Sequence, residues 1–321
     1  MSFNLWRIFG LIAAAGLVQL LSAWRWRVLL KFIKYKISYR KALGYYLSGF
    51  AVSYIMPVAA VGGRPAKAFL MNYTEGLPIK TGLVAALVEV FLEFMTDITF
   101  ILIVLPLLIF HFSFSERFEF SVTATVILLF LVIVYIFQQA RKGGGIISSL
   151  FKFLKLEKHL GVGRTREAFL EGEKLFSKFF QRQNKLLWQG IGLSFAVMVA
   201  GLLQVVAIFW LIGLPLTFVN IVLARALLHL AYLVPVPGAL GVSEWFQAGF
   251  FSATGMSSGV GVAFSVLYKA ADLLYVLCGL SFIAYAVTHY SIHKNKFSFR
   301  MIFNNGENSL DEKEPAQPDK K

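Results

Sequence analysis

The feature that most constrains this chain is a series of eight long stretches that contain no Asp, Glu, Lys or Arg. These stretches are 8–24, 42–63, 98–115, 120–140, 186–224, 226–243, 245–268 and 273–293. A helix needs about 20 apolar residues to cross the hydrocarbon of a bilayer. Only 15% of the residues are charged and 58% are hydrophobic, whereas soluble domains carry roughly 25% charged residues. The pattern therefore predicts a bilayer protein and excludes a disordered chain and an ordinary cytosolic enzyme.

The uncharged stretches are long and lack the alternation of a membrane barrel, so they predict helices. The 39-residue stretch 186–224 is too long for one span, and Gly213-Leu214-Pro215 interrupts it. It is interpreted as one span, a turn and the start of another helix. The expected fold class is an all-α polytopic membrane protein with about six full spans plus two re-entrant helical hairpins. The single cysteine, Cys278, excludes an intramolecular disulfide and a cysteine-based metal site.

The net charge of +14 lies in two segments. Residues 25–41 hold seven bases and no acid, and residues 139–186 hold eleven bases and four acids. Basic loops beside apolar stretches are typical of the cytoplasmic side of a membrane, so nucleic acid is not an expected partner. We expect a multi-pass protein of the inner (plasma) membrane, with the amino terminus outside and the carboxy terminus in the cytoplasm.

Two segments differ from the membrane body, which is expected to occupy residues 1–300. Apolar and basic residues alternate between 139 and 186, which predicts amphipathic helices lying on the cytoplasmic leaflet; a solvated linker with some buried packing fits equally well. Residues 301–321 are polar and include Pro315 and Pro318, so a disordered cytoplasmic tail is expected.

The two hairpins are predicted from helix-breaking residues inside apolar sequence. The first break contains Pro57, Gly62 and Gly63, and the second contains Pro237, Gly238 and Gly241. Non-helical backbone at membrane depth is tolerated where it lines a cavity or is packed in protein.

The two hairpins also resemble each other. A charged residue follows each break, namely Arg64 and Glu244, and a glycine then precedes a long span. Gly76 lies 13 residues before Glu89, and Gly255 lies 14 residues before Lys269. The pattern favours an inverted repeat, the architecture of alternating-access transporters, although chance similarity remains the alternative.

Ionisable side chains within spans cost about 2.5–3.5 kcal/mol each, so each needs a reason. Glu89, Glu93 and Asp97 form one acidic stripe at i, i+4 and i+8. The residues expected to bind substrate in a central polar cavity are Arg64, Lys67, Glu89, Glu93, Glu244 and Lys269. Those expected to support them are Asp97, Arg225, His229 and Asp272. The alternative is that these charges form internal ion pairs that fix hairpin packing.

The sequence also contains motifs that resemble a known family. The stretch from Pro57 through Gly62-Gly63-Arg64 and Gly76-Leu77-Pro78 to Glu89 and Glu93 is similar to the first signature of the lysylphosphatidylglycerol synthase/flippase transmembrane region. The run Pro237-Gly238-Ala239-Leu240-Gly241-Val242-Ser243-Glu244, with Gly255 and Lys269, resembles the second.

Four positions depart from the family's pattern. Val90 stands where the family often has Arg, Glu93 where it has Asp, Ala239 where it has Gly and Lys269 where it has Arg. The resemblance covers roughly residues 5–290 and implies an integral membrane protein that moves lipids or lipid-linked headgroups between leaflets. About 30 residues follow the last span, too few for the family's soluble aminoacyl-transferase domain, so enzymatic activity is not expected.

The resulting hypothesis is a lipid flippase-like transporter in which Arg64 and Lys269 meet a headgroup phosphate and the acidic stripe meets amines, hydroxyls or protons. Membrane lipids are the expected ligands, and no cofactor or metal is expected. The alternative is a non-catalytic membrane partner that docks a soluble lipid-modifying or glycosyl-transferring enzyme through residues 139–186. A membrane-embedded transferase or hydrolase with Glu89 or Glu244 as general base is a weaker alternative, because no nucleophile or metal set accompanies those residues.

Overall fold

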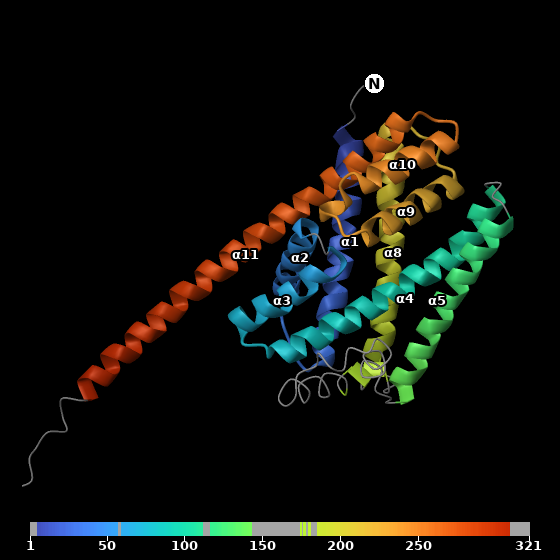
Figure 1. Ribbon diagram of the computed structural model, residues 1–321. Coiled ribbons are helices and arrows are strands. Elements are labelled where there is room, and N and C mark those ends of the chain that lie inside the picture. Colours follow the sequence, from blue (N-terminus) through green and yellow to red (C-terminus); the bar gives the residue numbers. More distant parts are fainter. Residues whose placement is uncertain are drawn as a thin grey trace, which may run out of the picture.

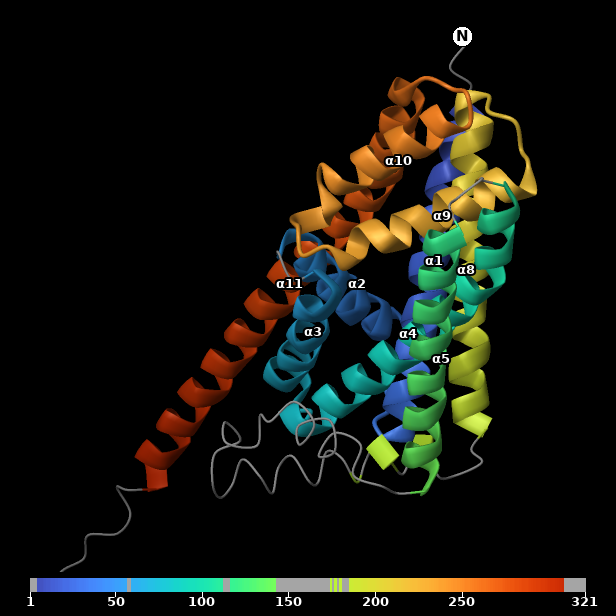
Figure 2. The ribbon, with the colours of Figure 1, turned by 45° about the vertical axis from the view of Figure 1, so that its right-hand side comes forward.

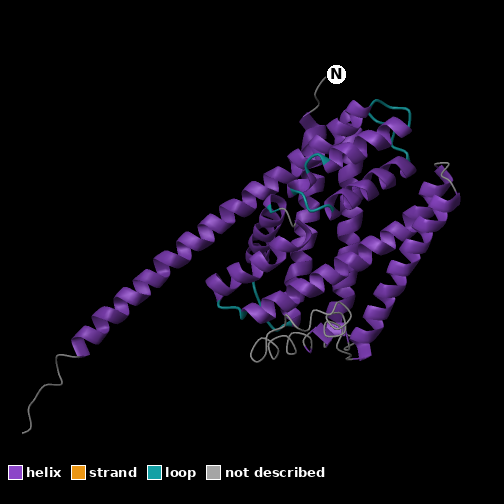
Figure 3. Ribbon diagram, in the orientation of Figure 1, coloured by secondary structure: helices purple, strands orange, loops and turns teal. Residues whose placement is uncertain are grey.

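The computed structural model describes residues 5–56, 59–111, 116–142, 174, 176–177, 179–180 and 185–308. Within these ranges the chain forms helices and short loops and contains no strand (Figure 3). The predicted all-α class is therefore confirmed for the described part of the chain.

Ten helical elements follow one another along the described residues (Figure 1). They are α1 (Leu5–Phe32), α2 (Tyr39–Ile55), α3 (Ala59–Glu75), α4 (Ile79–His111), α5 (Glu116–Lys142), α8 (Lys185–Ile212), α9 (Phe218–Leu233), the short 3₁₀ helix η2 (Pro237–Ala239), α10 (Val242–Ala253) and α11 (Ser258–Asn308). Gly76, Gly213 and Gly255 have φ of 70°, 75° and 80°, the left-handed conformation in which helices commonly end. The predicted turn between α8 and α9 is thus confirmed at Gly213.

Within the described residues, three helical segments are both long and apolar enough to cross a membrane, namely Leu5–Phe32, Lys185–Ile212 and Ser258–Tyr290. Helices α4 and α5 also have spanning length, at 33 and 27 residues. By contrast, α2, α3, α9 and α10 contain 17, 17, 16 and 12 residues. At 1.5 Å per residue these four reach about 18–26 Å, short of the roughly 30 Å of bilayer hydrocarbon.

The helices fall into two units with the same order of elements. The first unit comprises α1–α4 and the second comprises α8–α11; each has one 28-residue helix, two short helices and one long helix. The first short helix of each unit has a hydroxyl N-cap. The Ser38 hydroxyl oxygen accepts a hydrogen bond from the Lys41 backbone amide, and the Thr217 hydroxyl oxygen accepts one from the Asn220 backbone amide. Helices α1 and α8 pack together and run in opposite directions (Figures 1 and 2). The first helices of the two units are therefore antiparallel neighbours.

The break between the short helices differs between the units. In the second unit it runs from Val234 to Gly241, with Gly238 and Gly241 at φ of 53° and 80°, as the sequence predicts. In the first unit α3 already begins at Ala59, so Gly62 and Gly63 lie inside the helix and the break is shorter than predicted. The predicted breaker Pro57 lies outside the described residues.

Gly63 has a packing role instead. A Cβ atom at Gly63 would collide with the carbonyl oxygen of Gly49 and the hydroxyl of Ser53, and one at Gly49 would lie 2.7 Å from the carbonyl oxygen of Gly63. The Gly63 amide also donates a 3.1 Å hydrogen bond to the Ser53 hydroxyl. The two glycines therefore let the backbones of α2 and α3 touch, as small residues do between membrane helices.

The segment 139–186 is described only in part. Phe176, Phe179 and Phe180 are buried in a core with residues of α1, α2 and α4, and the ring of Phe179 packs 4.6 Å from that of Phe32. Most of the segment, and the tail after Asn308, lie outside the described residues, while α11 continues through residues 301–308.

We predict that Gly63→Ala separates α2 from α3 and lowers the apparent melting temperature in detergent by several degrees. Overpacking at a tight contact typically costs about 1–3 kcal/mol. Gly192→Ala on α8 is the matched control, because a Cβ there meets nothing within 4 Å. Equal melting temperatures for the two variants would contradict the proposed close contact.

Candidate functional site

A cluster of five charged side chains connects three helices of the first unit. Glu93 on α4 accepts from both Arg25 on α1 and Arg64 on α3. Glu89 pairs with Lys67 of α3, and its other oxygen lies 3.6 Å from Arg25. Arg25, Lys67 and Glu89 are 1–2% exposed, so their charges are removed from solvent. With three bases and two acids, the cluster has one positive charge in excess.

Arg25 is the member of this ion cluster that the sequence did not single out. The sequence places it in a basic cytoplasmic loop, but α1 continues to Phe32 and buries Arg25 inside the protein. Its guanidinium also donates a 3.2 Å hydrogen bond to Ser194 on α8, so it connects both units. The sequence feature that could have pointed to Arg25 is the acidic stripe on α4. Its three acids outnumber the two bases of α3, so a further cation is needed from another helix.

The ammonium group of Lys67 has aromatic neighbours as well as a carboxylate. Its nitrogen lies 3.9 Å from the ring centroid of Trp26 and 5.3 Å from that of Tyr46. Cation–π contacts of this kind compensate part of the cost of burying a charge. Lys67 is therefore held in one position by three helices.

In the second unit, Glu244 and Lys269 form an ion pair. Lys269 on α11 lies 2.6 and 2.9 Å from the two carboxylate oxygens of Glu244 on α10. Lys269 further donates to the carbonyl oxygen of Ala239, and Glu244 accepts from the Gly241 amide at 2.8 Å. Ala239 has φ of 50°, a conformation that favours glycine. The pair therefore stabilises the strained backbone of the second break.

In both units an ion pair joins the second short helix to the long helix, but the acid and the base exchange places between the units. In the first, bases on the second short helix meet acids on the long helix; in the second, the acid Glu244 meets the base Lys269. Arg225 is buried and donates a 2.5 Å hydrogen bond to Tyr268, while Asp272 accepts from Gln204 at 3.3 Å. These contacts join α8, α9 and α11.

A cavity of about 360 Å³ lies where the two units meet. Its acidic, basic and histidine lining comes from α3, α4 and α9 and consists of Arg64, Lys67, Glu89, Glu93, Asp97 and His229. Tyr46, Phe50, Tyr54, Phe94 and Tyr232 supply aromatic lining, and Gly238 of the second break closes one side. Such a cavity can hold a polar group within an otherwise apolar body.

The six residues expected to form one binding site therefore lie in two places. Four of the six predicted binding residues line the cavity, together with Asp97 and His229 from the supporting set. Glu244 and Lys269 are not among its lining residues; they support the break that ends at the cavity. The physical reason is that Glu244 satisfies the first turn of α10 and keeps Lys269 with it.

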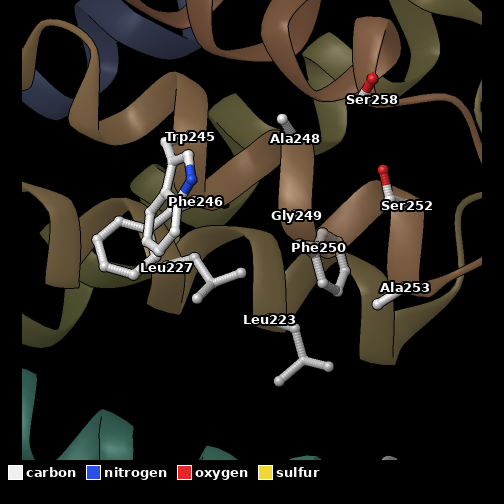
Figure 4. Close-up of a pocket in the computed structure, with 10 residues that line it drawn as sticks. All are labelled: Leu223, Leu227, Trp245, Phe246, Ala248, Gly249, Phe250, Ser252, Ala253 and Ser258. Atoms are coloured by element: carbon white, nitrogen blue, oxygen red, sulfur yellow. The ribbon is translucent and has the colours of Figure 1, made fainter.

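A second, apolar groove of about 530 Å³ lies between α9 and α10 (Figure 4). Leu223 and Leu227 line it from α9, and Trp245, Phe246 and Phe250 line it from α10. On α9, Leu227 and His229 differ by about 200° around the helix axis at 100° per residue. Helix α9 therefore forms a wall between this groove and the polar cavity.

Comparison with known proteins identifies the family. The profile described as "Lysylphosphatidylglycerol synthase TM region" matches residues 1–279. The chain belongs to this family. A curated relative, the "UPF0104 membrane protein" of Methanothermobacter thermautotrophicus, is 21% identical over 253 residues, which covers 76% of this chain and 75% of the relative. No solved structure matches the chain.

Membership of the family and the spanning helices together establish a multi-pass membrane protein. The match covers both units through the first part of α11, and so includes every residue of the cavity. Within the described residues, no group of three or more His, Cys, Asp or Glu side chains is arranged to hold a metal ion.

We predict that Glu89→Gln destabilises the protein strongly, by about 3–5 kcal/mol, because it leaves buried cations without their carboxylate. The double variant Lys67→Met/Glu89→Leu should cost less than Glu89→Gln, since it removes both partners of the closest pair. Chemical unfolding in detergent measures the free energy of unfolding of both variants. Lys41→Met, which breaks the surface pair with Glu75, is the control and should cost about 0–1 kcal/mol.

For the second break we predict that Lys269→Met speeds amide hydrogen exchange at residues 238–241, because three oxygen contacts of the ammonium are lost. In Lys269→Arg the same amides should exchange at nearly the wild-type rate, since the positive charge is kept. Exchange followed by mass spectrometry gives the answer, and unchanged exchange in Lys269→Met would argue against the stabilising role.

Proposed function

We propose that this protein is a lipid flippase-like transporter that moves a phospholipid or lipid-linked headgroup across the membrane through the polar cavity between its two units. The observation that carries the proposal is the cavity itself: about 360 Å³, lined by six acidic, basic or histidine side chains, in a chain of membrane-spanning helices. Without such a path, moving a charged headgroup through hydrocarbon is costly.

Arg64 gives the cavity a binding position for an anionic group. The ion cluster has three bases for two acids, and Arg64, at 21% exposure, is its most accessible base. A guanidinium recognises phosphate through directed, charge-assisted hydrogen bonds. Arg64 would meet the phosphate, and the carboxylates of Glu93 and Asp97 would meet amines or hydroxyls of the same headgroup.

The short helices supply the proposed mechanism. We interpret α2–α3 and α9–α10 as re-entrant hairpins whose breaks meet near the midplane, because each helix is too short to cross alone and the first helices of the two units are antiparallel. Rocking of one unit against the other would open the cavity to each leaflet in turn. The acyl chains would remain in lipid while the headgroup crosses.

The placement in the membrane follows from the basic residues. Lys34, Lys36 and Arg40 lie at the junction between α1 and α2, which we assign to the cytoplasmic side. The amino terminus would then be outside and the carboxy terminus inside the plasma membrane.

The test is leaflet transfer of labelled lipids with different headgroups in proteoliposomes. We predict headgroup-dependent transfer by the wild type and at least about a tenfold loss in Arg64→Gln, equivalent to about 1.4 kcal/mol in the barrier. Lys41→Met, far from the cavity lining, is the matched control and should transfer at the wild-type rate. Absence of transfer for every lipid by folded wild-type protein would refute the proposal and favour a docking role for the membrane body.

A further inference from the structure

Asp97 and His229 form a pair across the cavity between the two units. Asp97 lies on α4 of the first unit and His229 on α9 of the second, and the distance from Asp97 Oδ1 to His229 Nδ1 is 3.6 Å. Their side chains are 39% and 24% exposed, and both line the polar cavity. A proton that enters the cavity can therefore reach both groups.

This pair differs from the other acidic groups in and beside the cavity. Glu89 and Glu93 each face two permanent cations, and Glu244 faces Lys269. Among the residues described by the structure, the ion-pair partner of Asp97 is an imidazole. Because histidine changes charge near neutral pH, the attraction within this pair depends on a bound proton.

The surroundings set how many protons the pair can hold. Arg25 on α1, Arg64 on α3 and Arg225 on α9 interact electrostatically with Asp97, and Arg225 also with His229. Tyr54 on α2, Glu93 on α4 and Tyr232 on α9 line the same cavity. Tyr268 and Asp272 on α11 interact with Tyr232. The three arginines attract a carboxylate at Asp97, and Arg225 repels a positive charge on His229. The pair is thereby suited to alternate between no added proton and one.

The second nitrogen of His229 restricts the route. Nε2 is buried and has no hydrogen-bond partner among the described residues, and the ring packs against Phe100 at a centroid distance of 6.1 Å. Proton exchange therefore runs through Nδ1 and the Asp97 carboxylate, on the side open to the cavity.

We propose that Asp97 and His229 together form a proton-binding site, and that the proton they bind couples to the relative movement of the two units. The coupling of the proton to movement rests on the transport proposed above, whereas the binding of the proton does not. One proton from the cavity adds to the Asp97 carboxylate, and the carboxylic acid then donates a hydrogen bond to Nδ1 of the neutral His229 ring, with the two heavy atoms about 2.5–3.2 Å apart. The contact of 3.6 Å would then shorten, and α4 and α9 would be drawn together.

A bound proton changes the balance of two conformations only if it binds one of them more tightly. The site meets this condition, because its two groups lie on different units and the distance between them changes when the units move. Loss of the proton would release α9 from α4 and allow the cavity to open.

Proton binding is tested first by infrared difference spectroscopy of the full chain in lipid nanodiscs, between about pH 8 and about pH 5, the range around the histidine charge change. We expect a carboxylic-acid carbonyl band that titrates in the wild type, is absent in Asp97→Asn and is shifted in His229→Gln. Asp97→Glu should restore a band, and Lys41→Met should leave it unchanged. A titrating band that persists in Asp97→Asn would overturn the site; monodisperse elution of each variant shows that it is folded.

Coupling is tested by the ratio of lipid transfer rates with and without an imposed gradient of about two pH units in proteoliposomes, a hundredfold difference in proton activity. We expect a ratio of at least about five for the wild type and about one for His229→Gln, whatever their basal rates. Equal ratios would overturn the coupling. If no lipid is transferred but the Asp97 band titrates, the proposed function fails and the proton site stands.

Discussion

The buried ion cluster around Glu89 and Glu93 is the interaction on which the rest of this structure depends. A single charge in the interior of a membrane helix costs about 2.5–3.5 kcal/mol even on insertion scales. Arg25, Arg64 and Lys67 reach these two acids from two helices, and Arg25 also binds Ser194 of the second unit. Removing either acid leaves buried cations without compensation, so the cluster fixes how α1, α3 and α4 sit relative to one another.

The cluster also determines where the cavity can lie. Arg25 and Lys67 are almost completely buried, and the ammonium group of Lys67 packs over the ring of Trp26. The accessible part of the cluster, Arg64 and Glu93, faces the space between the units, where α9 contributes His229 and η2 contributes Gly238. One face of the same network is structural and the other is available to a ligand. The two interpretations of these charges, as packing pairs and as a binding site, therefore apply to different members of one cluster.

The second unit follows the same plan with different chemistry. The Glu244–Lys269 pair holds the break at Gly238 and Ala239, and it does not line the cavity. In the first unit, Gly49 and Gly63 let α2 and α3 pack backbone to backbone. Two repeated units can therefore present one shared cavity while only one of them provides most of its charged lining.

The sequence by itself determined the helical membrane class, the short helix pairs, the turn at Gly213, the second break and the charged residues worth attention, because apolar length, glycine and proline act locally. Only the tertiary structure decided which charges meet. It placed Arg25 inside α1 instead of a loop, kept Gly62 and Gly63 within α3, and brought Asp97 against His229 from 132 positions further along the chain. These outcomes depend on how helices distant in sequence pack against one another, and that packing has no local signature in the residues.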